Sequence, residues 1–151
     1  MQKKNEMKKI PIILLALCFW SCDRNEVNDN CNFLLDVGVD FVANLNLPQF
    51  NQLQFPVNAV RVEGQGNNGL ILVRSTSSSL IAWDGADPNH PPSSCNGLSI
   101  NNDGITATCG CGDENTYNLV NGLATTDNPQ PCTLKAYRVE PLGNNTFLIS
   151  N

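Results

Sequence analysis

Short segments in which apolar and polar residues alternate run through the chain from about residue 33 onward. In the first of them, residues 39–47, every second position is Val, Phe, Ala or Leu, and Pro48 follows directly. A period of two is typical of a strand with one buried face. The pattern therefore predicts a strand over 39–47 that ends at the proline.

Further short strands are predicted along the rest of the chain, separated by turns rich in Gly and Asn. They lie at 59–63, 70–74, 80–83, 98–100, 105–108, 116–120, 123–125, 134–139 and 146–150. The turns at 64–69, 101–104, 121–122 and 142–145 predict hairpins. No window in this region shows helical periodicity, so about ten short strands predict an all-β, antiparallel sandwich or barrel-like domain.

Three stretches do not fit simple hairpins. They are residues 84–97, 109–115 and 125–133, each rich in Pro, Gly, Asn or Asp. Together they hold four of the five cysteines that follow residue 22. Because binding and catalytic residues concentrate on loops that a rigid scaffold positions, we expect function to reside in these three loops.

The start of the chain resembles a bacterial lipoprotein signal. Residues 1–21 hold four lysines, then an apolar run over 10–20 that is too short to span a bilayer. Ser21 and Cys22 follow, so we expect cleavage before Cys22 and lipid attachment to its thiol. Cys18 is a weaker candidate for this site, and an ordinary secreted protein is the alternative. The predicted organisation is a signal over 1–21, a polar tether over 22–35 and one domain over 36–151.

Composition and charge narrow the class of partner. The 151 residues include 9 Lys and Arg against 14 Asp and Glu, a net charge of −5. This argues against nucleic acid, whose binders carry a basic footprint. An acidic body does not seek an anionic lipid surface, so the lipid anchor must provide membrane attachment. We expect a protein held in the envelope of a Gram-negative bacterium, at the outer membrane or periplasmic face, with an unidentified envelope protein or ligand as partner.

Cysteine and histidine counts carry most of the chemical information. The chain has seven Cys and one His, His90, which excludes any site that needs two imidazoles. Export would place five cysteines in a compartment where disulfides persist, and an odd number leaves at least one thiol unpaired. These five are Cys31, Cys95, Cys109, Cys111 and Cys132.

The order of segments over about residues 36–151 resembles a Rieske domain. The similarity lies in the strand 80–84 with its proline-containing loop, a hairpin, the Cys-Gly-Cys-Gly run at 109–112, the segment 117–122, and a further proline-containing loop before 134–139. The resemblance implies a β scaffold with three loops at one tip. It also implies a C-x-H and a C-x-x-H motif that bind a [2Fe–2S] cluster, and a disulfide between extra loop cysteines.

The chain departs from this pattern at the ligand positions. Asp87 and Asn89 stand where the first motif has Cys and His, and Gly112 stands where the second has His; only Cys109 matches. Moving the frame puts Pro88 or Glu114 at ligand positions instead. A Rieske centre needs two imidazoles on one iron, and the chain has one His. We therefore predict a cluster-free, cofactor-free, non-catalytic Rieske-like domain that acts as a structural or binding module.

The resemblance also suggests how the cysteines pair. Cys95 with Cys111 would bridge the first two loops, although Cys109 is an alternative partner for Cys95. Cys31 with Cys132 rests on parity alone. Two other functions stay open: an electron-transfer or oxidoreductase component with a real [2Fe–2S] centre, and a zinc-stapled binding domain. Zinc would use His90, Cys109, Cys111 and either Asp87 or Glu114, but C-x-C is not the usual zinc spacing. His90, beside Pro91, is predicted to be a solvent-exposed loop residue.

Overall fold

The structure, a computed structural model, describes residues 31–151. The predicted signal over 1–21, the predicted lipidation site Cys22 and the predicted tether up to residue 30 lie outside the described residues. Within 31–151, no helix is long and apolar enough to cross a membrane.

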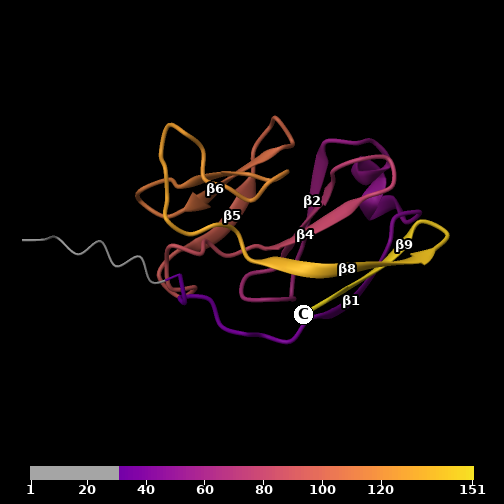
Figure 1. The fold of residues 1–151 in the computed structure, drawn as a ribbon, viewed down its shortest axis with the longest axis horizontal. Helices are drawn as coiled ribbons and strands as arrows, with labels where there is room; N and C mark the ends of the chain where they lie inside the picture. The colour runs from indigo at the N-terminus through magenta and orange to yellow at the C-terminus, as the bar shows by residue number, and fades with distance from the viewer. Residues whose placement is uncertain (1–30) are drawn as a thin grey trace, which may run out of the picture.

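The described chain is all-β and antiparallel, as predicted, with one short 3-10 helix (Figure 1). Its elements are β1 (Asp40–Asn44), η1 (Pro48–Gln54), β2 (Asn58–Val62), β3 (Leu70–Arg74), β4 (Leu80–Asp84), β5 (Asn96–Ile100), β6 (Thr106–Gly110), β7 (Thr116–Asn118), β8 (Ala136–Gly143) and β9 (Thr146–Ser150).

Six strands form a curved sheet in the order β1-β9-β8-β4-β3-β2. Phe41 of β1 and Val60 of β2, at its two edges, pack against one and the same core cluster, so the sheet curls into a half-barrel. Phe50 and Leu53 of η1 fill the same core. Burying each of these side chains contributes about 1.5–3 kcal/mol to stability.

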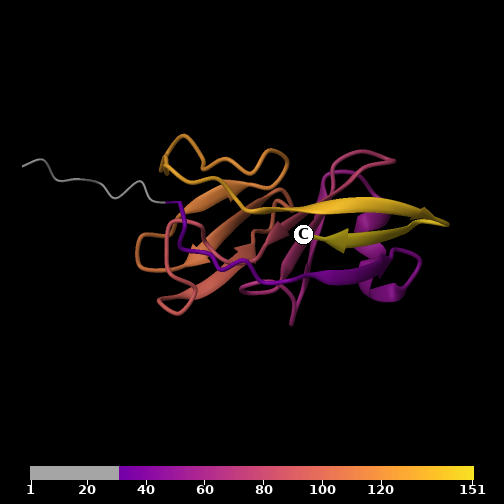
Figure 2. The same ribbon diagram turned by 60° about the horizontal axis from the view of Figure 1, so that its bottom comes forward.

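The remaining strands form a three-stranded sheet, β5-β6-β7, that lies at one end of the molecule (Figures 1 and 2). Its Leu98 and Tyr117 pack on Ile71 and Val73 of β3, in a second core. Leu70 and Leu72 of the same strand point into the first core. Strand β3 is therefore buried on both faces, which explains its unbroken apolar run.

Arg61 on β2 joins the two sheets. Its guanidinium donates hydrogen bonds to the Leu98 carbonyl on β5 (2.6 Å) and to the carbonyl and side chain of Asn68 (2.6 and 2.9 Å), and its Nε pairs with Glu63 at 2.6 Å. A carbonyl that accepts from a charged donor makes a stronger hydrogen bond than one that accepts from a neutral group. The arginine therefore fixes the middle of β5, the strand into which the first predicted loop leads.

Two predictions about the elements were wrong: the absence of any helix, and a strand at 123–125. Residues 48–54 form η1, because Pro48 begins the helix and Phe50 and Leu53, three positions apart, bury one face of a 3-10 turn. Residues 123–125 form no strand; only an isolated bridge joins Ala124 to Tyr117. The 121–122 turn accordingly closes no two-stranded hairpin, and nine strands replace the ten expected.

The described part of the predicted tether lies against the domain. Leu35 accepts a hydrogen bond from Asn67 Nδ2 (3.0 Å), and its own amide donates to Asn67 Oδ1 (2.9 Å). Lys135 Nζ donates to the Leu35 carbonyl at 2.9 Å. These bonds hold the segment before β1 beside the base of the loop tip.

Gly122 packs against the Trp83 ring, and we predict that Gly122→Ala lowers the free energy of unfolding by about 2 kcal/mol or more. Its φ is +74°, and an added Cβ would lie 2.7 Å from the indole. Chemical denaturation measures the change.

Two further glycine variants separate the cost of the positive φ from the cost of the contact with Trp83. Gly143 also has a positive φ (+88°) but open space around it, so Gly143→Ala should show the backbone cost alone, about 1 kcal/mol. Gly112, also in open space but without a positive φ, should tolerate Ala without measurable loss. Equal losses in the Gly122 and Gly143 variants would contradict the packing argument.

Candidate functional site

A buried carboxylate turns the chain out of β4 into the first loop. Asp84 Oδ2 accepts hydrogen bonds from the Tyr137 hydroxyl (2.6 Å) and from the amide and side chain of Asn67 (3.0 and 2.8 Å). Its Oδ1 accepts from the Ala86 amide at 2.9 Å. All these partners are donors, so the carboxylate fixes where the loop begins.

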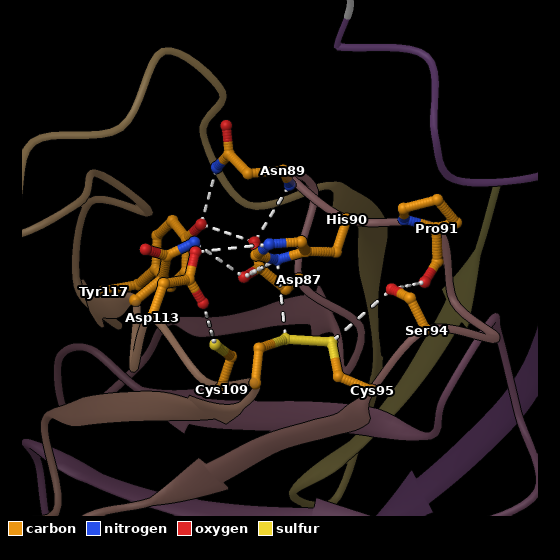
Figure 3. The surroundings of a disulfide bond; sticks show 11 residues. Asp87, Asn89, His90, Pro91, Ser94, Cys95, Cys109, Asp113 and Tyr117 are labelled. Carbon is orange, nitrogen blue, oxygen red and sulfur yellow. Dashed lines mark hydrogen bonds and ion pairs between the residues drawn. A yellow bond between two sulfur atoms is a disulfide. The ribbon is translucent and has the colours of Figure 1, made fainter.

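Asp87 lies three residues further on and is the centre of the tip (Figure 3). Its side chain is 1% exposed. Oδ1 accepts from the Tyr117 hydroxyl (2.5 Å) and the Asn89 amide (2.9 Å), and Oδ2 accepts from Asn115 Nδ2 (3.0 Å) and lies 2.9 Å from His90 Nδ1. Both oxygens therefore have two polar partners each.

These contacts set the charge states of the buried groups. Burial by itself would raise the pKa of Asp87, but the hydrogen bonds from Tyr117, the Asn89 amide, His90 and Asn115 lower that pKa below its ordinary value. Burial and the neighbouring Asp87 carboxylate raise the pKa of Tyr117. At neutral pH the pair is thus a charged acceptor and a neutral donor.

His90 sits between two carboxylates. Nδ1 faces Asp87 Oδ2, and Nε2 lies 3.2 Å from Asp113 Oδ2 on the second loop. Nδ1 is also 3.4 Å from Cys111 Sγ. The prediction of a solvent-exposed His90 was therefore wrong: the ring is 28% exposed and is held between the first two loops.

Asn89 connects the first loop to the third. Its Oδ1 accepts from the Cys132 amide (3.2 Å), and its Nδ2 donates to the Cys132 carbonyl (3.1 Å) and to the Tyr117 hydroxyl (2.6 Å). Asn128 of the third loop donates in turn to Asn115 of the second (3.1 Å). Side-chain amides thus join all three loops, as expected of segments that carry buried polar groups.

Two disulfides fasten the same region, and both match the pairings suggested from the sequence. Cys95 is bonded to Cys111, between the first two loops, and Cys31 is bonded to Cys132 of the third. Disulfides persist in oxidising compartments, so they are typical of a protein that matures outside the cytoplasm. In the chain-entropy model they contribute about 3 and about 4.7 kcal/mol, respectively.

Cys109 is the free cysteine among residues 31–151, and it is buried. Its Sγ lies 3.6 Å from Asp113 Oδ1. Burial, together with the nearby Asp87 carboxylate, raises the pKa of Cys109 to about 11. The thiol is therefore protonated at neutral pH, and a protonated, buried thiol is a poor nucleophile.

The residues at the four positions that the resemblance to a Rieske domain assigns to cluster ligands do not fit a [2Fe–2S] cluster. The oxygens of Asp87 accept hydrogen bonds, and a carboxylate is a hard ligand poorly matched to an iron–sulfide cluster. The Asn89 amide is bonded to Cys132 and Tyr117, and Gly112 has no side chain. Cys109 alone offers a suitable donor.

A different set of donors does converge here. One donor atom from each of Asp87, His90, Cys109 and Cys111 lies within 4.8 Å of every other. Glu114, the alternative to Asp87 in the zinc interpretation, is exposed and is not in this group. Cys111, however, is engaged in the disulfide, so three of the four groups have an unblocked donor atom.

Sequence reasoning missed three members of this site: Asp113, Asn115 and Tyr117. Tyr117 falls in the predicted strand 116–120, and its side chain is indeed buried in the core. The available signal was the spacing of Asn115 and Tyr117, two apart and therefore on one face of the chain as it enters β7. Nothing local indicated that this face meets Asp87.

Comparisons with known proteins add little to this geometry. No protein-family model matches the chain, and no curated protein sequence matches it. Among solved structures, the chain is similar to a protein described as an NADH-dependent nitrite reductase small subunit from Mycobacterium tuberculosis. The two are 16% identical, the match covers 77% of this chain and 97% of that one, and the TM-score is 0.42. At this TM-score the similarity carries no argument about family or activity.

We predict that Asp87→Asn lowers the free energy of unfolding at pH 7 by about 1–3 kcal/mol, because the amide cannot accept from all the present donors. The pKa of Asp87 is lowered in the folded protein, so its stabilising effect is present above the ordinary carboxyl pKa. It is lost as pH falls through the folded pKa. Denaturation of both proteins from pH 7 to pH 3 should show the difference shrinking at the acid end.

The matched control is Asp127→Asn, which changes an exposed carboxylate on the third loop. Surface substitutions of this kind stay within about 0.5 kcal/mol. A difference between wild type and Asp87→Asn that is constant across the pH range would contradict the assigned role of the Asp87 charge.

Proposed function

We propose that this chain is a cluster-free, non-catalytic Rieske-like module of an envelope lipoprotein, with a structural or binding role. Support for the Rieske-like part comes from the order of the sequence segments, from the all-β architecture and from the Cys95–Cys111 disulfide, which joins the two loops that the resemblance pairs. Support for the envelope comes from the two disulfides and the lipoprotein-like signal.

One observation carries the proposal: the oxygens of Asp87 are used within the protein. Each accepts hydrogen bonds from groups fixed on the loops or on β7, among them Tyr117 and Asn115. A carboxylate in this state neither holds a cluster nor acts as a free general base. The residue therefore fixes the loops instead of performing chemistry.

Three loops held in place at the tip of an anchored domain can serve as a binding surface for a partner. Amide hydrogen bonds and a disulfide join the loops to one another, which restricts their independent movement. Preorganised loops lose little conformational entropy on binding, which favours affinity. The partner we propose is an envelope protein or ligand that contacts the three-loop tip.

Metal and sulfide analysis tests the absence of a cluster. The chain, purified anaerobically, should be colourless, with no visible absorption and no stoichiometric iron or acid-labile sulfide. A brown protein with about two irons and two sulfides per chain would overturn the proposal in favour of an electron-transfer or oxidoreductase component.

A gain-of-function variant is the control for this assay. The triple variant D87C/N89H/G112H, with Cys109 unchanged, places Cys and His at all four ligand positions. Iron and sulfide reconstitution of this variant should produce visible absorption that wild type treated identically lacks. Equal uptake by both proteins would contradict our assignment of these positions.

Cys22→Ala tests the anchor. Without its thiol the chain cannot take a diacylglyceryl group, so it should move from the membrane fraction to the soluble envelope fraction and lose incorporation of labelled palmitate. Cys18→Ala is the matched control and should stay membrane-bound. Membrane retention and labelling of the Cys22 variant would exclude Cys22 as the anchor.

A further inference from the structure

We propose that reduction of the Cys95–Cys111 disulfide creates a zinc-class cation site formed by Asp87, His90, Cys109 and Cys111. This goes beyond the proposed function, because it assigns the tip a single-ion site whose availability depends on the redox state. The proposed site does not depend on an iron–sulfur cluster, because a single ion needs only the one imidazole of His90 and no sulfide.

The four donor atoms lie close enough together for small movements to place them around one ion. Zinc–sulfur and zinc–nitrogen bonds of about 2.3 and 2.0 Å set ligand-to-ligand separations of roughly 3.3–3.8 Å. His90 Nδ1 lies 2.9 Å from Asp87 Oδ2 and 3.4 Å from Cys111 Sγ, and no pair in the group exceeds 4.8 Å. Movements of about an ångström would therefore suffice to surround one ion.

Groups behind these donors hold them in the orientation that a metal needs. A ligating His commonly donates its other ring N–H to a carboxylate. His90 has this arrangement: with Nδ1 toward the ion, Nε2 faces Asp113 Oδ2 at 3.2 Å. Asp87 keeps its hydrogen bonds from Tyr117 and Asn115, and its Oδ2 becomes available to the ion when His90 Nδ1, now 2.9 Å away, binds that ion instead. Asp113, Tyr117 and Asn115 thus hold His90 and Asp87 in place around the ion.

Cys111 can act as the fourth ligand only when its disulfide with Cys95 is reduced. A dithiol reductant transfers two electrons and two protons to the Cys95–Cys111 bond, becomes a disulfide itself and leaves two thiols. Zn²⁺ then binds the sulfurs of Cys109 and Cys111 as thiolates, and their two protons pass to solvent. Cys95 stays a free thiol. In the oxidised protein Cys111 Sγ has no thiolate to offer.

Both reactants can reach the site. His90, Cys95, Cys111 and Asp113 line an open groove at the surface of the tip, and Figure 3 shows the ring of His90 beside the disulfide. Cys109 closes the buried side. The ion would therefore enter from the groove and be enclosed from below.

Cys95→Ser tests the site without a reductant, because it leaves Cys111 permanently unpaired. Zn²⁺ affinity is measured anaerobically by competition with a chromophoric chelator, and Co²⁺ reports thiolate coordination through its absorption spectrum. We expect one ion per C95S chain, bound at least 100-fold more tightly than by oxidised wild type. Wild type treated with a phosphine reductant should behave as C95S does.

Further substitutions in C95S identify the ligands. C95S/C109S should lose the thiolate bands and most of the affinity, and C95S/D113N should bind roughly 10–100-fold more weakly. C95S/D127N, changed at an exposed carboxylate outside the cluster, should keep the affinity of C95S. Before titration, circular dichroism should confirm that each variant is folded. A thiol assay should confirm that Cys109 and Cys111 of C95S are both free.

Two results would overturn the site. One is equal, weak Zn²⁺ binding by oxidised wild type, reduced wild type and C95S. The other is tight binding by C95S that the Cys109 substitution leaves unchanged. Neither result bears on the iron and sulfide analysis, so failure of this proposal is distinguishable from failure of the proposed function.

Discussion

The buried negative charge of Asp87 is the constraint on which the loop tip depends. An ionised carboxylate away from water costs several kcal/mol unless hydrogen-bond donors surround it. Those donors come from different parts of the chain: Tyr117 lies on β7, Asn115 just before it, and His90 in the first loop. The first loop and the segment entering β7 therefore cannot move apart without removing donors from the buried charge.

The packing of the two sheets places the residues that make this constraint. Strand β3 is buried on both faces, so it fixes the three-stranded sheet against the half-barrel. That packing brings the end of β4 beside β7, and hence Asp87 beside Tyr117. The Cys95–Cys111 bond then closes the outer side of the tip. The disulfide and the hydrogen-bond network act at the same place, one covalently and the other through a buried charge.

Much of the fold was predictable because period-two patterns and Gly-Asn turns are local signals. The bounds of β3 and β9 match the predicted ones, and β2, β4, β5 and β6 lie within a few residues of theirs. Helix η1 was missed because its two buried residues, three positions apart, fall outside the alternating pattern. Segment 123–125 was predicted as a strand because it follows the Asn-Gly turn at 121–122, but only an isolated bridge joins it to Tyr117.

By itself, the sequence determined what the tip cannot be: one histidine in the whole chain cannot supply the two imidazoles of a Rieske centre. It also determined which cysteines were available to pair. Only the tertiary structure decided what the residues at the predicted ligand positions do. Asp87 and Tyr117 are 30 residues apart, and no local pattern encodes their contact. Burial turns an unremarkable loop aspartate into the centre of a network, and burial depends on how the two sheets pack.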